Sequence, residues 1–119
     1  NIKAESSAKL VRKLSGGNQQ KVLLGKCLSP APKVLLVHEP TRGIDVAAKI
    51  EIYTLLKKLA REEQVAVVMV SSDLMEVLNV SDRILVVYGG GISGELAAAD
   101  ATEESVMRLA TGVAKEAAV

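Results

Sequence analysis

Hydrophobic residues recur along the chain at two spacings, one helical and one typical of strands. An i, i+3, i+4, i+7 stripe predicts a helix that begins after Asp45 and ends near Ala60. The stripe consists of Ile52, Leu55, Leu56 and Leu59. Short uninterrupted apolar runs are typical of strands that are covered on both faces. Such runs occur at Lys33–Val37, Val65–Val70 and Ile84–Val87.

Turn and cap residues predict the remaining elements. Good helix formers fill Gly16–Leu28, with Val22, Leu23, Cys27 and Leu28 on one side, and the prolines in Ser29–Pro32 end that helix. Asp73 and Glu76 have the spacing of a capping box at the start of a short helix. Gly89–Gly91 predicts a hairpin turn into Ile92–Leu96, and Thr102 caps a last helix that ends at Gly112.

The predicted order is therefore α-β-α-β-α-β-β-α. Buried strands separated by helices indicate an α/β fold with a mostly parallel sheet and flanking helices. We expect residues 1–13 to form a loop or frayed helix, residues 14–112 to form the folded part, and residues 113–119 to be a mobile tail.

Composition excludes several classes of protein. The 119 residues are 49% hydrophobic and 24% charged, which is ordinary for a globular domain. The net charge is +1 and aromatic residues make up 2%, so a nucleic-acid partner is not expected. The longest apolar run is far shorter than the ~20 residues that span a bilayer. We expect Cys27 and the methionines Met69, Met75 and Met107 to be buried core residues.

The stretch Leu14–Lys21, which reads LSGGNQQK, is the first candidate site. A serine and two glycines at the start of a helix leave backbone N–H groups sterically open, and the helix dipole favours an anion there. The alternative is a plain N-cap followed by a glycine turn. On this stretch alone, phosphate binding is the preferred interpretation.

The stretch Val34–Pro40, which reads VLLVHEP, is the second candidate site. A carboxylate that follows a buried strand lies at the carboxyl edge of the sheet, where open α/β sheets bind ligands. Glu39 could take a proton from an attacking water there. On this stretch alone, an exposed loop glutamate is the better interpretation.

Together these stretches closely resemble the nucleotide-binding cassette of ABC transporters. LSGGNQQ resembles the signature motif, Val34–Glu39 the Walker B strand, and Gly43–Asp45 the D-loop. NQQ after the glycines and EPTRGID from Glu39 to Asp45 are similar to the second cassette of bacterial importers of ribose, galactose and xylose. Ser71–Leu78 and Ser81–Leu85 fit the same cassette. The resemblance implies a P-loop NTPase-like, RecA-like sheet.

The resemblance also implies partners and residue roles. Cassettes pair head to tail, so the signature residues would hold the γ-phosphate of ATP bound to a partner cassette. These residues are Ser15, Gly16 and Gly17, followed by Asn18 and Gln19. Glu39 would be the general base, Asp45 would join the two sites across the interface, and Ser72 occupies the position of the switch histidine. The parent system would contact membrane permease subunits from the cytoplasmic face of the bacterial membrane.

Three departures from the family pattern limit the implied activity. No Walker A motif, Gly-x-x-x-x-Gly-Lys-Ser/Thr, occurs in the sequence, so the chain resembles the C-terminal half of one cassette. His38 stands where the family has the aspartate that supports Mg²⁺, and imidazole is a poor ligand for that ion. A tolerated substitution is the preferred interpretation of His38. A serine at the position of Ser72 is typical of the second cassettes of sugar importers, and the resemblance implies that the two ATP sites of such an importer are unequal.

The missing Walker A strand predicts a gap in the sheet. The resemblance implies that this strand lies between the Walker B strand and the switch strand. Either the strands at Val34–Val37 and Val65–Val70 pair directly, or another chain fills the gap. We expect self-association, because an open strand edge invites pairing.

The sequence thus predicts a partial ATP-hydrolysing component of a carbohydrate import system, with negligible ATPase activity of its own and weak or no binding of ATP and Mg²⁺. One alternative is a non-catalytic chain that docks to intact cassettes as a regulator. Another is the chromosome-maintenance branch of the superfamily, which the near-neutral charge and the sugar-type loop disfavour.

Overall fold

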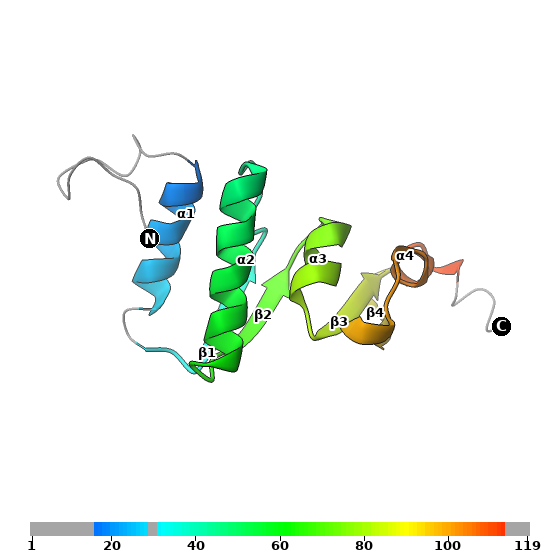
Figure 1. Cartoon of the computed structure of the whole chain (residues 1–119). Helices are drawn as coiled ribbons and strands as arrows, with labels where there is room; N and C mark the ends of the chain where they lie inside the picture. The colour runs from blue at the N-terminus through cyan, green and yellow to red at the C-terminus, as the bar shows by residue number, and fades with distance from the viewer. Residues whose placement is uncertain (1–15, 29–30, 114–119) are drawn as a thin grey trace. The chain divides into compact units, whose positions relative to one another are not determined.

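The computed structural model describes residues 16–28 and 31–113, and their order of elements is the predicted one (Figure 1). The helices are α1 (Gly16–Leu28), α2 (Val46–Arg61), α3 (Leu74–Val80) and α4 (Glu103–Ala110), with a short 3₁₀ helix at Ala98–Asp100. The strands are β1 (Val34–His38), β2 (Ala66–Val70), β3 (Arg83–Tyr88) and β4 (Gly91–Ala97). The chain divides into two compact units, one up to Ser72 and one from Asp73. The expectations for residues 1–13, for Ser15 and for the tail after Val113 lie outside the described residues.

β1 and β2 pair directly as a parallel two-stranded sheet. Val34 lies opposite Ala66, and the register continues without a shift to His38 opposite Val70. The gap expected between these two strands is therefore absent, and direct pairing is the alternative that holds. The backbone groups on the shared edge bond to each other, so this edge needs no strand from another chain. The open edge from which self-association was expected is therefore absent between these strands.

One face of the β1–β2 sheet is open, which corrects the expectation that these strands are covered on both faces. Alternate residues on the open face are exposed: Val34 by 54%, Leu36 by 73%, Val68 by 51% and Val70 by 57%. On the opposite face Leu35 is buried, and α2 contacts β2. Because strand side chains alternate between faces, a single helical layer can cover only every second residue.

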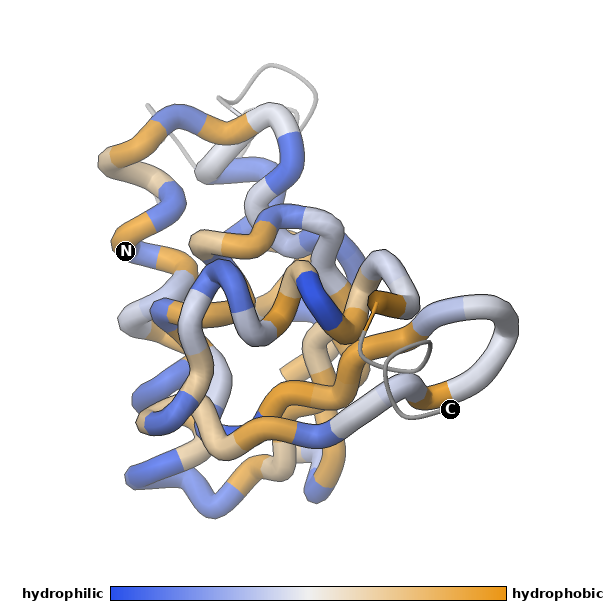
Figure 2. Tube along the Cα trace, turned by 90° about the vertical axis from the view of Figure 1, so that its right-hand side faces the viewer, coloured by the Kyte–Doolittle hydropathy of each residue, from blue (hydrophilic) through white to orange (hydrophobic). Residues whose placement is uncertain are grey.

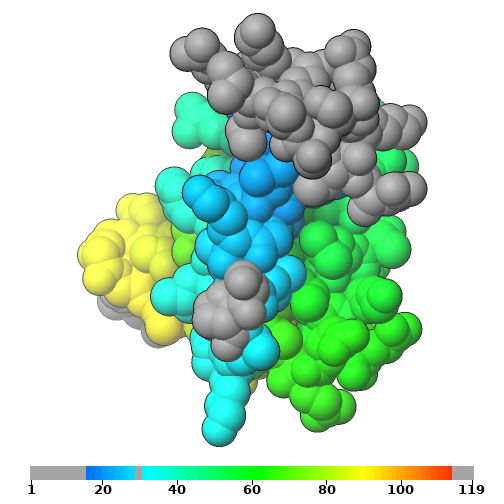
Figure 3. Space-filling model, turned by 90° about the vertical axis from the view of Figure 1, so that its left-hand side faces the viewer, coloured from blue at the N-terminus to red at the C-terminus, as the bar shows by residue number. Residues whose placement is uncertain are grey.

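The core of the first unit is built mainly on α2. Ile52, Leu56 and Leu59 are buried, as the stripe predicted, and Asp45 caps the helix through the Ala48 N–H. Figure 2 shows hydrophobic (orange) stretches of the trace interrupted by hydrophilic (blue) ones. α1 contacts α2. Figure 3 shows α1 (blue) against α2 (green), and the two helices lie side by side in Figure 1.

The buried side of α1 differs from the predicted one. Gly17 and Leu24 are its buried residues, whereas Leu23 and Cys27 are exposed. α1 packs along α2 at its glycine end, and this contact selects which side of the helix is covered. The prediction of a buried Cys27 was therefore wrong.

The second unit is an antiparallel hairpin packed with α3 and α4. β3 and β4 pair around Gly89 and Gly90, which both have positive φ, as a tight turn requires. Ile84, Val86 and Val106 form the buried centre. The predicted caps are present, since the Asp73 side chain accepts N–H bonds at the start of α3 and Thr102 forms a capping box at the start of α4.

Two of the three methionines do not fill the core. Met75 is 51% exposed and Met107 is 47% exposed, so the prediction of buried methionines was wrong for both. Among the helices of the described residues, none has the length and apolar character needed to cross a membrane.

The packing of α2 gives a test of the fold. Ile52→Ala removes a side chain with no exposed surface and should lower the free energy of unfolding by about 2–5 kcal/mol. Ile50→Ala is the matched control in the same helix, because Ile50 is 58% exposed and its loss should cost under about 1 kcal/mol. Urea unfolding followed by circular dichroism measures both. Equal losses would contradict the assignment of Ile52 to the core.

Candidate functional site

The parallel pairing of β1 and β2 places two candidate residues at one edge of the sheet. Glu39 follows the last residue of β1, and Ser72 follows β2 by two residues. The Ser72 N–H donates to Glu39 Oε1 at 2.7 Å, and the Glu39 N–H donates to the Val70 carbonyl at 2.7 Å. This is the carboxyl edge, where open α/β sheets bind ligands. The structure therefore brings the predicted base and the predicted switch residue together.

Glu39 adopts an uncommon backbone conformation. Its φ is 48°, in the left-handed region that few residues other than glycine occupy. Such a conformation costs of order 1 kcal/mol or more and persists where the surrounding contacts hold it. Two hydrogen bonds to the end of β2 hold Glu39, one through its main chain and one through its carboxylate. The chain therefore turns sharply at Glu39 while the carboxylate stays at the strand ends.

His38 does not form a magnesium site with its neighbours. It is the last residue of β1 and is exposed, on the same face as Val34 and Leu36. Among the described residues, no group of three or more His, Cys, Asp or Glu side chains could hold a metal ion. Mg²⁺ prefers hard oxygen ligands in octahedral geometry, and the imidazole of His38 does not supply one. The side chains at this strand end thus do not fit Mg²⁺.

The signature stretch divides into an exposed and a buried part. Gly16 at the tip of α1 is exposed, whereas Gly17 is buried. A Cβ at Gly17 would lie 2.5 Å from the Ala48 Cβ, so only glycine allows α1 to approach α2 this closely. Asn18 and Gln19 are half-buried, and both already have interaction partners. Gly17 is thus a packing residue here, while Gly16 is exposed.

The signature tip and the D-loop are brought together by this packing. A Cβ at Gly16 would lie 3.7 Å from the Gly43 carbonyl oxygen, and one at Gly17 would lie 3.6 Å from Ile44. Asp45 Oδ1 accepts the Ala48 N–H at 2.9 Å, so its carboxylate is the N-cap of α2. An ion pair between Lys21 and Glu51 also joins the two helices. The tip of α1 and the loop at residues 43–45 therefore form one surface feature.

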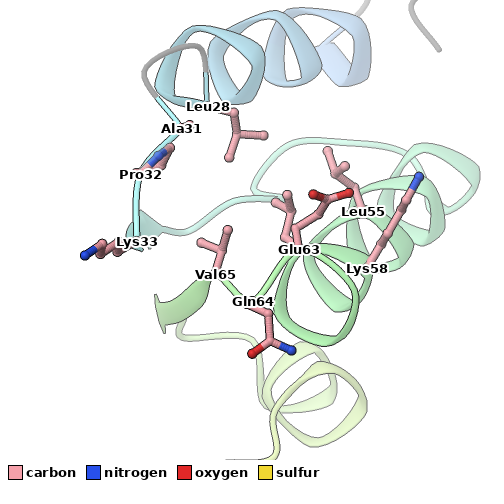
Figure 4. A pocket seen from close by; sticks show the side chains of 10 residues that line it. Leu28, Ala31, Pro32, Lys33, Leu55, Lys58, Glu63, Gln64 and Val65 are labelled. Carbon is pink, nitrogen blue, oxygen red and sulfur yellow. The ribbon is translucent and has the colours of Figure 1, made fainter.

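A cavity of about 480 Å³ lies at the other end of the first unit (Figure 4). Leu28, Leu55, Leu59 and Val65 line it with apolar side chains, and Lys33 precedes β1 at its rim. Residues that precede parallel strands lie at the amino edge of the sheet, opposite Glu39 and Ser72. None of the predicted site residues among those described lines this cavity.

Two features of the site were not predicted from the sequence. The main-chain contact of Ser72 with Glu39 depends on the register of β1 and β2, which the apolar runs do not specify. The contact of Gly17 with Ala48 depends on how two helices cross. Small residues such as Gly17 and Ala48 on two helices are a weak sequence signal for close helix packing. The glycine pair at the start of α1 was interpreted instead as a phosphate-binding helix start.

Solved structures that are similar in fold include ABC ATPase cassettes. The ATP-binding cassette MJ0796, solved as a dimer bound to ADP and Pi, matches with a TM-score of 0.72 and 29% sequence identity. The match covers 82% of this chain and 41% of that one. An inward-facing metal-chelate type ABC transporter matches in fold with a TM-score of 0.77 at 20% identity. The described residues therefore have the fold of part of an ABC ATPase cassette, as predicted.

Curated relatives are ribose import ATP-binding proteins. The chain is 56% identical to RbsA of Lactococcus lactis subsp. lactis over 112 residues, and 57% identical to RbsA of Bacillus subtilis over 111 residues. These matches cover 94% and 93% of this chain, but only 23% and 22% of the relatives. The chain thus spans less than a quarter of their length. No protein-family model matches the sequence. The predicted resemblance to the sugar-importer cassettes is confirmed.

The contact between α1 and α2 gives a second test. Gly17→Ala would place a methyl group against Ala48 and should lower the free energy of unfolding by about 1–3 kcal/mol. Gly25→Ala is the matched control in the same helix. Nothing lies within 4 Å of a Cβ at Gly25, so helix propensity should stabilise that variant by up to about 1 kcal/mol. Denaturant titration measures the free energy of unfolding of both variants. A stabilised Gly17→Ala would contradict the close packing of α1 against α2 at this position.

Proposed function

We propose that this chain is part of the ATP-hydrolysing, energy-coupling component of a carbohydrate import system. The observation that carries the proposal is its 56% identity to a ribose import ATP-binding protein over nearly the whole chain. The grouping of Glu39 with Ser72, and of the signature tip with the D-loop, supports it. In this proposal the chain contributes the signature, Walker B and D-loop parts of a cassette.

The signature tip acts on a nucleotide that a partner cassette holds. Gly16 is exposed at the N-terminus of a 13-residue helix, whose dipole favours the negative charge of a phosphate. Ser15 and the amides around Gly16 and Gly17 would complete this contact, with Asn18 and Gln19 behind them. Asp45, which caps α2 beside the tip, would lie at the interface with the partner.

Glu39 acts on the attacking water. Its carboxylate lies at the carboxyl edge of the sheet and is half-buried, so it can accept a proton as the water oxygen attacks the γ-phosphate. Ser72, exposed at the end of β2, lies beside it. ATP supplies the phosphoryl group, and no step is assigned to Mg²⁺ because the side chains here do not fit that ion.

The chain alone should be inactive, because the sequence lacks the Walker A loop that cradles the phosphates. Hydrolysis at Glu39 therefore requires a Walker A loop that this sequence does not contain. A partner cassette in head-to-tail contact brings its own Walker A loop and ATP to the signature tip. In a complete import system of this kind, the cassettes would lie on the cytoplasmic face of the membrane. Their closing and reopening would be transmitted to the membrane permease subunits.

The signature role predicts association that depends on nucleotide. A tagged full-length relative, such as RbsA of Bacillus subtilis, should capture this chain with ATP and not without it. Gly16→Asp places a negative charge at the helix tip and should reduce capture by about tenfold or more, since phosphate is repelled. Gly25→Asp, exposed on the same helix, is the matched control and should bind as the unmodified chain does.

Two outcomes would contradict this proposal. Capture that does not depend on ATP would favour a regulator that docks by another surface. Steady-state ATP hydrolysis by the chain alone, abolished by Glu39→Gln, would refute the requirement for a Walker A loop from outside this sequence.

Self-association is a further part of the proposal, with the open face of the β1–β2 sheet as its surface. The face carries Val34, Leu36, Val68 and Val70, with His38 at its end and no Asp, Glu, Lys or Arg side chain. The chain has a net charge of only +1. Leu36→Lys should shift the protein from dimer to monomer in light scattering at micromolar concentration. Ile50→Lys, at an exposed apolar position on α2, is the control. If the unmodified chain is monomeric, self-association is refuted, and the proposed role in ATP hydrolysis is unaffected.

A further inference from the structure

We infer that Ser72 positions the Glu39 carboxylate through its main-chain N–H and not through its hydroxyl group. This inference rests on the proposed function, in which Glu39 is the general base. It assigns the residue at the switch position a role that does not depend on the identity of its side chain.

The geometry at the two strand ends carries the inference. The Ser72 N–H lies 2.7 Å from Glu39 Oε1, a short distance for an N–H···O bond. The Glu39 N–H is bonded to the Val70 carbonyl at the same distance. The last residue of β2 and the residues after it therefore bind Glu39 at both its main chain and its carboxylate.

The backbone conformation of Glu39 explains why its side chain needs this hydrogen bond to keep one direction. In the extended conformation, successive side chains point to opposite faces of the sheet. The φ of 48° at Glu39 ends this alternation, so the strand no longer fixes the direction of its side chain. A glutamate also has three rotatable side-chain bonds, and ordering them costs conformational entropy. The bond from Ser72 supplies the missing constraint.

The consequence for the reaction is a base held in place before substrate arrives. The Ser72 N–H uses one acceptor site of Oε1. The carboxylate keeps its other acceptor sites, on Oε1 and on Oε2, for the proton of an attacking water. A general base must be within hydrogen-bond reach of the water it activates, so fixing its direction matters for the rate. Because the donor is a main-chain amide, serine at this position can hold the base as well as another residue would.

The experiment is a measurement on the isolated, isotope-labelled chain by nuclear magnetic resonance. A scalar coupling across the hydrogen bond should connect the Ser72 amide nitrogen with the Glu39 carboxylate carbon. Glu39→Gln should keep a coupling and slow amide exchange at Ser72, because a side-chain carbonyl oxygen still accepts. Glu39→Asp should speed exchange at Ser72 by about tenfold, because the shorter side chain withdraws the acceptor and a bond to a charged group is worth about that factor.

Ser72→Ala separates the main chain from the side chain. It removes the hydroxyl group and should leave the coupling unchanged. The amides of the β1–β2 ladder serve as the internal control in every variant, since their slow exchange shows that the unit is folded. Glu63→Ala, which removes an exposed carboxylate of the same unit, should alter none of these signals.

Absence of the coupling in the unmodified chain would overturn the inference, as would its loss in Ser72→Ala. Either result would leave the proposed function standing, because capture by an ATP-loaded cassette does not require this bond. If the ATP-loaded cassette fails to capture the chain while the coupling between Ser72 and Glu39 is present, the proposed function is refuted. The hydrogen bond between the two residues then remains as a feature of the fold.

Discussion

The parallel pairing of β1 with β2 is the contact on which the candidate site depends. Parallel strands end at the same edge of their sheet, so a residue after β1 and a residue after β2 meet although 32 residues separate Glu39 from Ser72 along the chain. The register fixes which groups meet. A shift by one residue would move the Val70 carbonyl away from the Glu39 N–H and the Ser72 N–H away from the carboxylate.

Close packing of two helices sets the second half of the site. Gly17 allows α1 to lie against α2 at Ala48, and this approach holds the exposed Gly16 beside the loop that begins α2. The signature glycines thus have different roles in the described structure. One makes the helix contact possible, and the other stays accessible at the helix tip, where the backbone N–H groups of an N-terminus favour an anion.

The open face of the β1–β2 sheet follows from the same architecture. α2 packs on one side of the two strands, and the valine and leucine side chains of the other side are exposed. Fully apolar strands are typical of sheets covered on both faces. The match to the cassette MJ0796 covers 41% of that chain.

The sequence by itself determined the order of the elements, the α/β class, the stripe on α2 and the caps at Asp73 and Thr102, because these depend on spacing and turn chemistry that are local in the chain. It also carried the resemblance that the relatives confirm. Only the tertiary structure decided that β1 and β2 pair directly, that Gly17 faces Ala48, that Cys27 and two methionines are exposed, and that Ser72 holds Glu39 by its main chain. These features depend on strand register and helix crossing, which arise from contacts between distant residues and leave no periodic signal in the sequence.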